Sequence, residues 1–197
     1  MDSVFWTYLK LGRDHIADLG AYDHMLFLLA LCAVFTISHW RQVILLATGF
    51  TLGHSITLIG AGLDIIRFPM DVIEILIPVT IILTGIYNLR RGPLEKGESL
   101  RRNHYFLAAG FGLIHGMGFS NFLRSALMPG EESELVIQLL AFNIGIELGQ
   151  VIIVLVILAI SWLIVNQFGL SKRYWNGALS ILAIGVSLFL LWEKIPF

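Results

Sequence analysis

The sequence predicts an all-α membrane protein, a bundle of six transmembrane helices preceded by an amphipathic helix in the membrane interface. Hydrophobic residues make up 57% of the 197 residues and charged residues only 14%, whereas a soluble domain carries about a quarter charged residues. The apolar residues are gathered in blocks of about 17 to 25, the length that crosses a bilayer as a helix. Lipid offers no partner for unpaired backbone groups, so these blocks are expected to be helical.

The N-terminal segment 1–19 mixes apolar and charged residues and is too polar for the core of a signal peptide. Its apolar side chains recur at roughly helical spacing, which is typical of an amphipathic helix that lies in the interface. They are Phe5, Tyr8, Leu9, Ile16 and Leu19. Gly12 falls on the same stripe and leaves a gap in it.

Six apolar spans follow, and with the first segment they form a single membrane domain, 1–197. The spans cover about 22–38, 42–62, 70–89, 104–127, 137–165 and 174–192. The fifth is longer than a bilayer requires, so it is expected to tilt or to begin outside the hydrocarbon. The segment 90–103 is the one sizeable polar connection.

Lys and Arg are distributed unevenly between the two sides of this bundle. The connections 38–41, 90–103 and 166–173 share one side and hold eight of these residues, against five on the other side, where the acidic run 131–134 also lies. Cytoplasmic loops carry the excess of Lys and Arg, so the first side is predicted to be cytoplasmic and both termini periplasmic.

Several spans carry ionisable or amide side chains at a similar depth, in their outer halves. Such groups are costly inside a membrane and are therefore candidates for function. At about 1.5 Å per helical residue, the groups at similar depth are His24, His54, Asp71, Glu74, His115, Asn143, Glu147 and Gln150. His15 and Asp23 stand at the same threshold, and no Lys or Arg lies deep enough to pair these carboxylates.

Clustered imidazoles and carboxylates indicate a transition-metal site. A lone intramembrane His is more often a helix-to-helix hydrogen bonder, so the prediction depends on convergence. The lack of thiolate and thioether ligands disfavours Cu(I), and the number of His residues disfavours Mg²⁺ or Ca²⁺. The predicted ligands are His15, Asp23, His24, His54, Glu74, His115 and Glu147, for one or two ions. The expected supporting residues are Ser55, Asp71, Asn143 and Gln150.

A short internal repeat supports a shared site. "GFTLGHS" at 49–55 and "GFGLIHG" at 110–116 match as Gly-Phe-x-Leu-x-His. Both lie on spans that run in the same direction, so His54 and His115 are expected to face a common interior. The pairs Gly112/Gly116 and Gly145/Gly149 have GxxxG spacing, which lets helices approach closely.

The chain resembles the HupE/UreJ family of bacterial membrane proteins over essentially its whole length. The residues that carry the resemblance are "LGRDHIADLGAYDHMLFLLAL" (11–31), "GFTLGHSITL" (49–58), Glu74 and Asn88 of the third span, "GLIHGMGFS" (112–120) and "FNIGIELGQ" (142–150). The resemblance implies a nickel or cobalt permease, or a metal accessory protein of hydrogenase and urease systems, in the bacterial inner membrane. The "H…DH" and "LGHS" pieces are also similar to motifs of nickel/cobalt transporters, which implies that His15, Asp23, His24 and His54 contact metal.

Different classes of function stay open at this point. The first is a membrane permease or accessory for Ni, Co or Zn, with the metal ion and the lipid bilayer as partners and with either a homo-oligomer or a metalloenzyme maturation partner. The second is an intramembrane hydrolase that uses a metal-activated water, for which Ser55 beside His54 is suggestive. A purely structural or partner-binding membrane protein is the third. The net charge of −1 gives no reason to expect nucleic acid as a partner.

Overall fold

The structure, a computed structural model, describes residues 2–18, 23–65, 67–100, 102–126 and 135–194, and within them it contains helices and no strands. Within these ranges the helices are α1 (Asp2–Ile16), α2 (Asp23–Cys32), α3 (Trp40–Gly62), α4 (Met70–Arg91), α5 (Asn103–Ala126), α6 (Leu135–Trp162) and α7 (Lys172–Lys194). A short 3₁₀ turn, Ile37–His39, precedes α3, and a π-helical turn, Leu163–Gln167, follows α6. The acidic run 131–134 lies outside the described residues.

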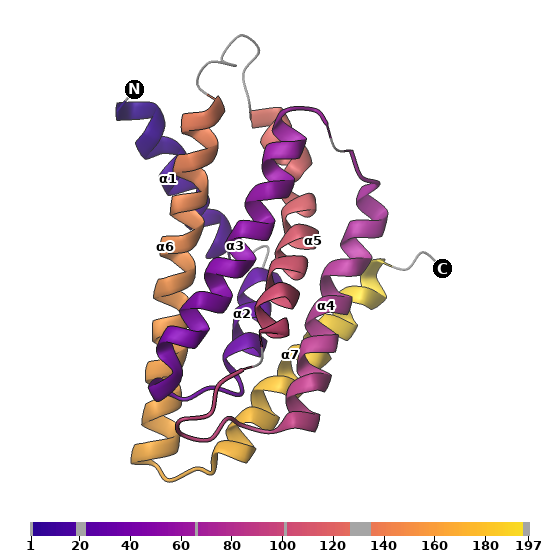
Figure 1. The fold of residues 1–197 in the computed structure, drawn as a ribbon. Coiled ribbons are helices and arrows are strands. Elements are labelled where there is room, and N and C mark those ends of the chain that lie inside the picture. Colours follow the sequence, from indigo (N-terminus) through magenta and orange to yellow (C-terminus); the bar gives the residue numbers. More distant parts are fainter. Residues whose placement is uncertain (1, 19–22, 66, 101, 127–134, 195–197) are drawn as a thin grey trace.

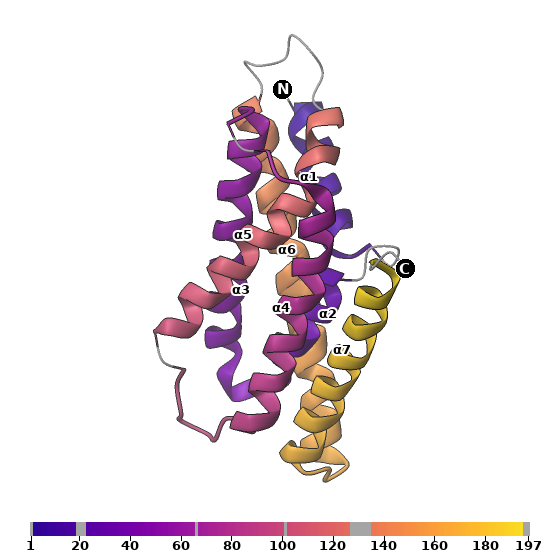
Figure 2. The same ribbon diagram turned by 90° about the vertical axis from the view of Figure 1, so that its right-hand side faces the viewer.

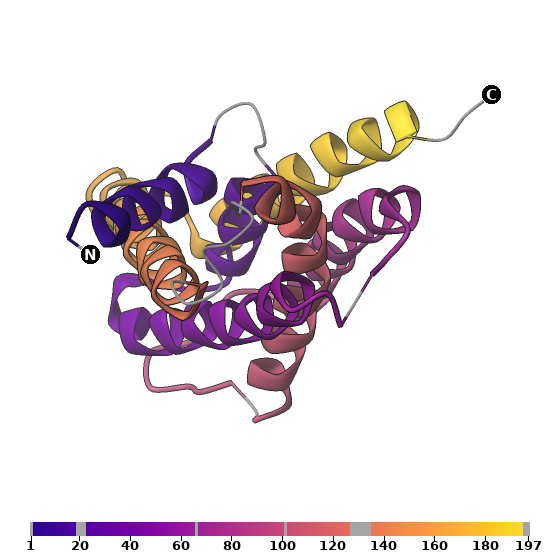
Figure 3. The same cartoon turned by 90° about the horizontal axis from the view of Figure 1, so that it is seen from above.

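The helices pack mainly in three pairs around a central short helix. α1 lies along α6, α3 along α5, and α4 along α7 (Figure 1). α2 contacts α3, α4, α6 and α7, and seen from above it lies in the middle of the bundle (Figure 3). Six of its ten residues are buried, so α2 is a core helix.

Four helices are long and apolar enough to cross a membrane, and they confirm that this is a membrane-type bundle. They are α3 with its preceding turn, α4, α6 with its following turn, and α7, while α2 is a shorter apolar helix. The predicted count of six spans is therefore not confirmed as such. Span 22–38 in particular is shorter than expected, since α2 ends at Cys32.

The interfacial placement expected for 1–19 is likewise not confirmed, because α1 packs lengthwise against α6. α1 descends beside α6 and ends part-way down the bundle, and α2 continues in the lower half at a different lateral position (Figure 1). A polar stripe and an apolar stripe are also what a helix needs when it packs against a neighbour and lines a water-filled space. The hydrophobic pattern could not distinguish these two settings.

Glycines set the distance between the paired helices. A Cβ at Gly12 would lie 2.0 Å from the carbonyl oxygen of Phe142, and one at Gly145 would lie 2.1 Å from that of Leu9. The gap that Gly12 leaves in the apolar stripe is thus a point where the backbones of α1 and α6 approach closely. Gly112 is equally close to the backbone of Phe50 in the α3/α5 pair, which confirms the packing role expected of the GxxxG glycines.

The polar connection after α4 folds back against the lower end of the bundle. Gly92, with φ of +78°, ends α4 in a backbone conformation that residues with a Cβ rarely adopt. The Leu94 N–H donates to the carbonyl of Val34 at 2.8 Å, and the ring of buried His39 bonds the carbonyl of Glu95 at 3.0 Å. This end of the bundle is therefore covered by its own chain.

Candidate metal centre

Four histidines from four helices converge inside the bundle. His15 lies in the last turn of α1, His24 in the first turn of α2, His54 on α3 and His115 on α5. The ring of His24 is 4.7 Å from that of His15, 5.9 Å from that of His54 and 5.2 Å from that of His115, measured between centroids. The structure thus brings together the four histidines that the sequence singled out, and the short repeat does place His54 and His115 around a common interior.

The break between α1 and α2 is what carries polar groups into the middle of the protein. α1 ends at Ile16 and α2 begins at Asp23, so His15 and His24 flank the break and face one another. Within an unbroken helix the backbone N–H and C=O groups are hydrogen-bonded to one another. A break leaves some of them unpaired, and inside a membrane it is tolerated only where protein or a water-filled cavity surrounds it. Broken helices of this kind commonly border ion sites.

Most ring nitrogens of this cluster have no hydrogen-bond partner in the part of the chain that the structure describes. His54 is fully buried and lacks a partner at both Nδ1 and Nε2. The same holds for Nε2 of His15, Nε2 of His24 and Nδ1 of His115. A buried polar atom without a partner costs about 1–3 kcal/mol, so this density of them needs a compensating ligand. A metal ion would be coordinated by the lone pairs of such nitrogens.

Neighbouring side chains orient two of these rings. The ionised Asp23 carboxylate can only accept, so Nδ1 of His24, 3.0 Å from Oδ1, is the nitrogen that carries the hydrogen. The Thr80 hydroxyl donates its hydrogen to the carbonyl of Ile77 at 2.7 Å. It therefore accepts a hydrogen bond from Nε2 of His115 at 3.2 Å. In both rings the remaining nitrogen is left with a lone pair, the form that a metal ligand requires.

The ligand atoms form two overlapping groups of three. His15, His24 and His54 can bring one atom each within 4.8 Å of one another, and so can Asp23, His24 and His115. Three protein ligands with room for a further one are the usual composition of an exchangeable or catalytic metal site. His24 belongs to both groups, which makes it the centre of the cluster.

A large cavity of about 780 Å³ leads from the surface to these histidines. We call it the vestibule. Its lining includes His15, Asp23, His24 and His115 at the inner end. The other charged residues that line it are Asp14, Asp18, Glu74, Glu193 and Lys194. Acidic groups outnumber basic ones, and a cavity lined by one sign of charge concentrates ions of the opposite sign.

Aromatic rings lie against the histidines on the other side. Phe27 and Phe50 stack with centroids 4.8 Å apart, and their rings lie 5.3 Å and 5.1 Å from that of His115. Both side chains are about 1% exposed. We call this pair the aromatic floor. It puts an apolar, close-packed layer between the cluster and the lower half of the bundle.

The other predicted ligands lie elsewhere or make other contacts. Glu74 lines the vestibule but pairs with Lys194 at 2.8 Å. Glu147 accepts a hydrogen bond of 2.5 Å from Thr48 across the α3/α6 contact, and its second oxygen is buried without a partner among the described residues. Asp71 is exposed in the first turn of α4.

The supporting residues expected from the sequence belong mostly to this α3/α6 contact. Ser55 donates to the side-chain oxygen of Asn143 at 2.7 Å, and Thr51 donates to that of Gln150 at 2.8 Å. With Thr48 and Glu147 these form three polar links between the two helices. Interhelical hydrogen bonds of this type hold membrane helices together.

Sequence reasoning missed three residues that contribute to the site. Nothing in the sequence around Thr80 marks it as functional, and only the fold shows that it lies against His115. Asp14 on α1 and Asp18, two residues past the end of α1, both line the vestibule, whereas the interfacial interpretation would place their side chains in water.

The comparison with protein families agrees with this architecture. A family model described as HupE / UreJ protein matches residues 1–193. The chain belongs to the HupE/UreJ family. No curated protein and no solved structure matches the chain. The family link carries membrane metal handling with it, and the histidine cluster is where this HupE/UreJ chain has groups that could bind the metal.

Proposed function

We propose that this HupE/UreJ protein captures a divalent transition-metal ion from the vestibule side of the membrane and binds it at His15, His24, His54 and His115. The observation that carries the proposal is the set of buried ring nitrogens without partners, gathered from four helices at the end of an open acidic cavity. Asp23 orients His24 and is close enough to act as a ligand itself.

The proposed topology treats α1 and α2 as one discontinuous crossing. Together with α3 to α7 they make six crossings, with the vestibule facing the periplasm and the 92–102 connection facing the cytoplasm. The clustering of Lys and Arg in that connection supports this orientation. The metal would then be collected outside the cell, where the acidic vestibule raises its local concentration.

The ligand set favours Ni²⁺, Co²⁺ or Zn²⁺ as the ion. Neutral imidazole with one or two carboxylates suits these borderline ions, and thiolate, which soft ions prefer, is absent from the described site. Family membership points to nickel or cobalt for transport. Zinc would bind as well, since affinity alone does not separate these ions.

Because the aromatic floor is closed, the described conformation is one that can bind an ion from the vestibule and does not pass it to the lower half. Below the cluster the stacked rings of Phe27 and Phe50 lie in the way of an ion, and the Asn88 side chain in the lower half donates to the Ala30 carbonyl. Transport therefore requires the floor to open. A closed floor equally suits the second candidate, a metal-dependent hydrolase that keeps its ion and leaves one position open to water.

Uptake by reconstituted vesicles separates these functions. Vesicles are loaded with a nickel-sensitive dye, and Ni²⁺, Co²⁺ or Zn²⁺ is added outside. We expect uptake that is lost in His24→Ala and His54→Ala and retained in Leu52→Ala, a change at a lipid-exposed position two residues from His54. Absence of uptake, together with an ion that survives prolonged chelation, would favour the hydrolase.

A further inference from the structure

A second cavity, of about 310 Å³, lies below the aromatic floor and is separate from the vestibule. Residues of α2, α3, α4 and α5 line it, together with Leu100 from the polar connection. Its apolar lining includes Phe27, Leu31, Leu46, Leu83, Leu107 and Phe111. We call it the lower cavity. A space of this composition is a poor site for water, which needs two to four polar partners.

The lower cavity opens sideways, between α4 and α5. Leu83 on α4 and Leu107 on α5 are more than half exposed at its edge, whereas Phe27 and Leu46 at its inner end are 1% and 2% exposed. Figure 2 shows α5 leaning away from α4 toward the lower end of the bundle. The opening therefore faces the hydrocarbon of the surrounding bilayer, on the side of the 92–102 connection.

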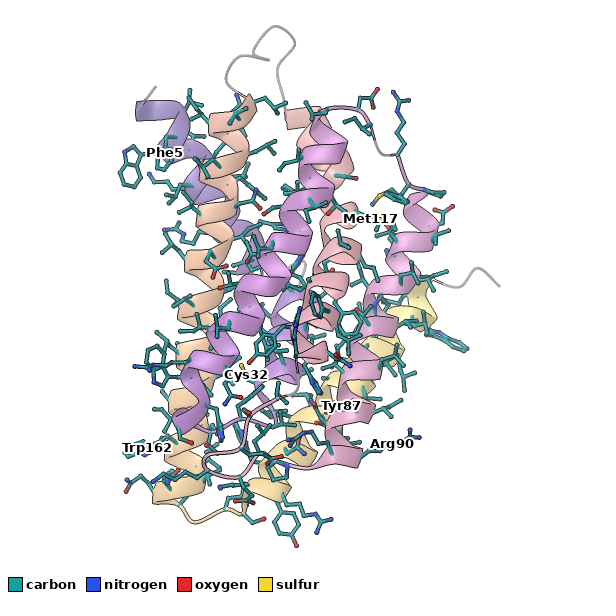
Figure 4. All side chains as sticks on the ribbon, in the orientation of Figure 1. Phe5, Cys32, Tyr87, Arg90, Met117 and Trp162 are labelled. Carbon is teal, nitrogen blue, oxygen red and sulfur yellow. The ribbon has the colours of Figure 1, made fainter. Side chains whose placement is uncertain are left out.

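A polar and basic rim lies at the lower end of this opening. The Tyr87 hydroxyl and Nε2 of His104 are hydrogen-bonded at 2.5 Å across the gap from α4 to α5. Arg90 extends away from the bundle less than one turn beyond Tyr87 (Figure 4), and Arg102 places its guanidinium 5.5 Å from the ring of Phe106. Neither arginine has an acidic partner among the described residues, whereas Arg91 pairs with Glu98 at 2.6 Å.

We propose that the lower cavity binds one acyl chain of an anionic phospholipid from the leaflet on this side, with its headgroup at Arg90 and Arg102. The apolar lining selects a hydrocarbon chain, because burial of apolar surface is the interaction that it offers. The two unpaired arginines select negative charge at the depth where headgroups lie. This inference does not depend on the metal, since the aromatic floor separates the chain from the histidines.

Photochemical labelling tests the proposal. The full-length protein is reconstituted in phosphatidylcholine vesicles with a minor fraction of phosphatidylglycerol that carries a diazirine near the end of one acyl chain. After illumination, labelled residues are mapped by mass spectrometry. We expect label on Phe27 and Leu46, which lipid at the outer surface of the bundle cannot reach, and at least fivefold less label there from the matching phosphatidylcholine probe.

Two exposed variants sharpen the test without disturbing the core. Leu107→Trp narrows the mouth of the cavity and should reduce the internal label at least fivefold, whereas Leu155→Trp on α6, also exposed, should leave it unchanged. Arg90→Gln combined with Arg102→Gln should abolish the preference for phosphatidylglycerol. Label confined to exposed residues, or internal label that Leu107→Trp does not reduce, would overturn the acyl-chain site. Equal internal labelling by the two probes would overturn the selection of an anionic headgroup.

Discussion

Replacing Gly53 by alanine should push α3 and α5 apart and damage the proposed metal centre beside it. The added Cβ would lie 1.9 Å from the carbonyl oxygen of Ala109, whereas ordinary van der Waals contact begins at 3.4 Å. The helices must therefore separate locally by about 1.5 Å, the difference between these distances. Overpacking of this kind costs about 1–3 kcal/mol. His54 is the next residue, and metal ligands tolerate displacements of only about 0.2 Å.

The unfolding of Gly53→Ala can be followed through Cys32, the single cysteine, which is 1% exposed. A thiol-reactive fluorophore reports its exposure as the detergent-solubilised protein is heated. Gly110→Ala on α5 is the matched control, since a Cβ there meets nothing within 4 Å and alanine favours the helix by up to about 1 kcal/mol. We expect Gly53→Ala to unfold at a lower temperature than the native protein and to bind metal more weakly. Equal stability of the two variants would refute the close approach of α3 and α5.

Two further predictions concern the site and the connection below it. Asp23→Asn should weaken Zn²⁺ binding about 10- to 100-fold, since it removes the charge that orients His24, and equilibrium dialysis against a chelator measures this. The pKa of Glu98 is lowered, first by the hydrogen bond from the backbone N–H of Glu95 and further by Arg91. The bonds of the Glu98 carboxylate to these two residues are therefore present at neutral pH and are lost as the pH falls through that lowered pKa. Glu98→Gln should loosen the connection at pH 7 and speed tryptic cleavage after Lys96, whereas an unchanged cleavage rate would show that Glu98 does not hold it.

The histidines of the proposed site could be predicted because the sequence shows imidazoles inside apolar segments, where placing a polar group costs free energy. His54 and His115 interrupt apolar segments where an imidazole has no place unless something binds it. The glycines that bring α3 and α5 close, Gly53 and Gly112, stand at variable positions of the repeat, whereas a Cβ at the shared Gly110 would meet nothing within 4 Å. Residue type and spacing were sufficient for this part.

The carboxylates were harder to assign, because depth along a helix does not determine the direction of a side chain. Glu147 has a depth similar to that of the histidines by residue count but bonds Thr48 on another face of α3. Glu74 faces the vestibule, where Lys194 from the far end of the chain reaches it. Contacts between residues so distant in sequence depend on how the helices pack, which hydrophobic pattern alone does not specify.

The first segment shows a further limit of the pattern. α1 is amphipathic because one face packs on α6 and the other lines an acidic cavity, and a helix lying on a membrane would have the same periodicity. Gly12 is the residue that could have separated the two settings. In an interfacial helix a glycine in the apolar stripe only removes apolar surface. Against Phe142, the lack of a side chain at Gly12 allows direct backbone contact.

X-ray absorption spectroscopy of the zinc-loaded protein tests the central claim most directly. If the buried histidines bind the ion, the spectrum will show imidazole scattering with Zn–N distances of about 2.0–2.1 Å. Fewer imidazoles should remain in His54→Ala, while Leu52→Ala should match the native protein. A spectrum without imidazole scattering, or one that His54→Ala and His24→Ala leave unchanged, would contradict a metal centre at this cluster.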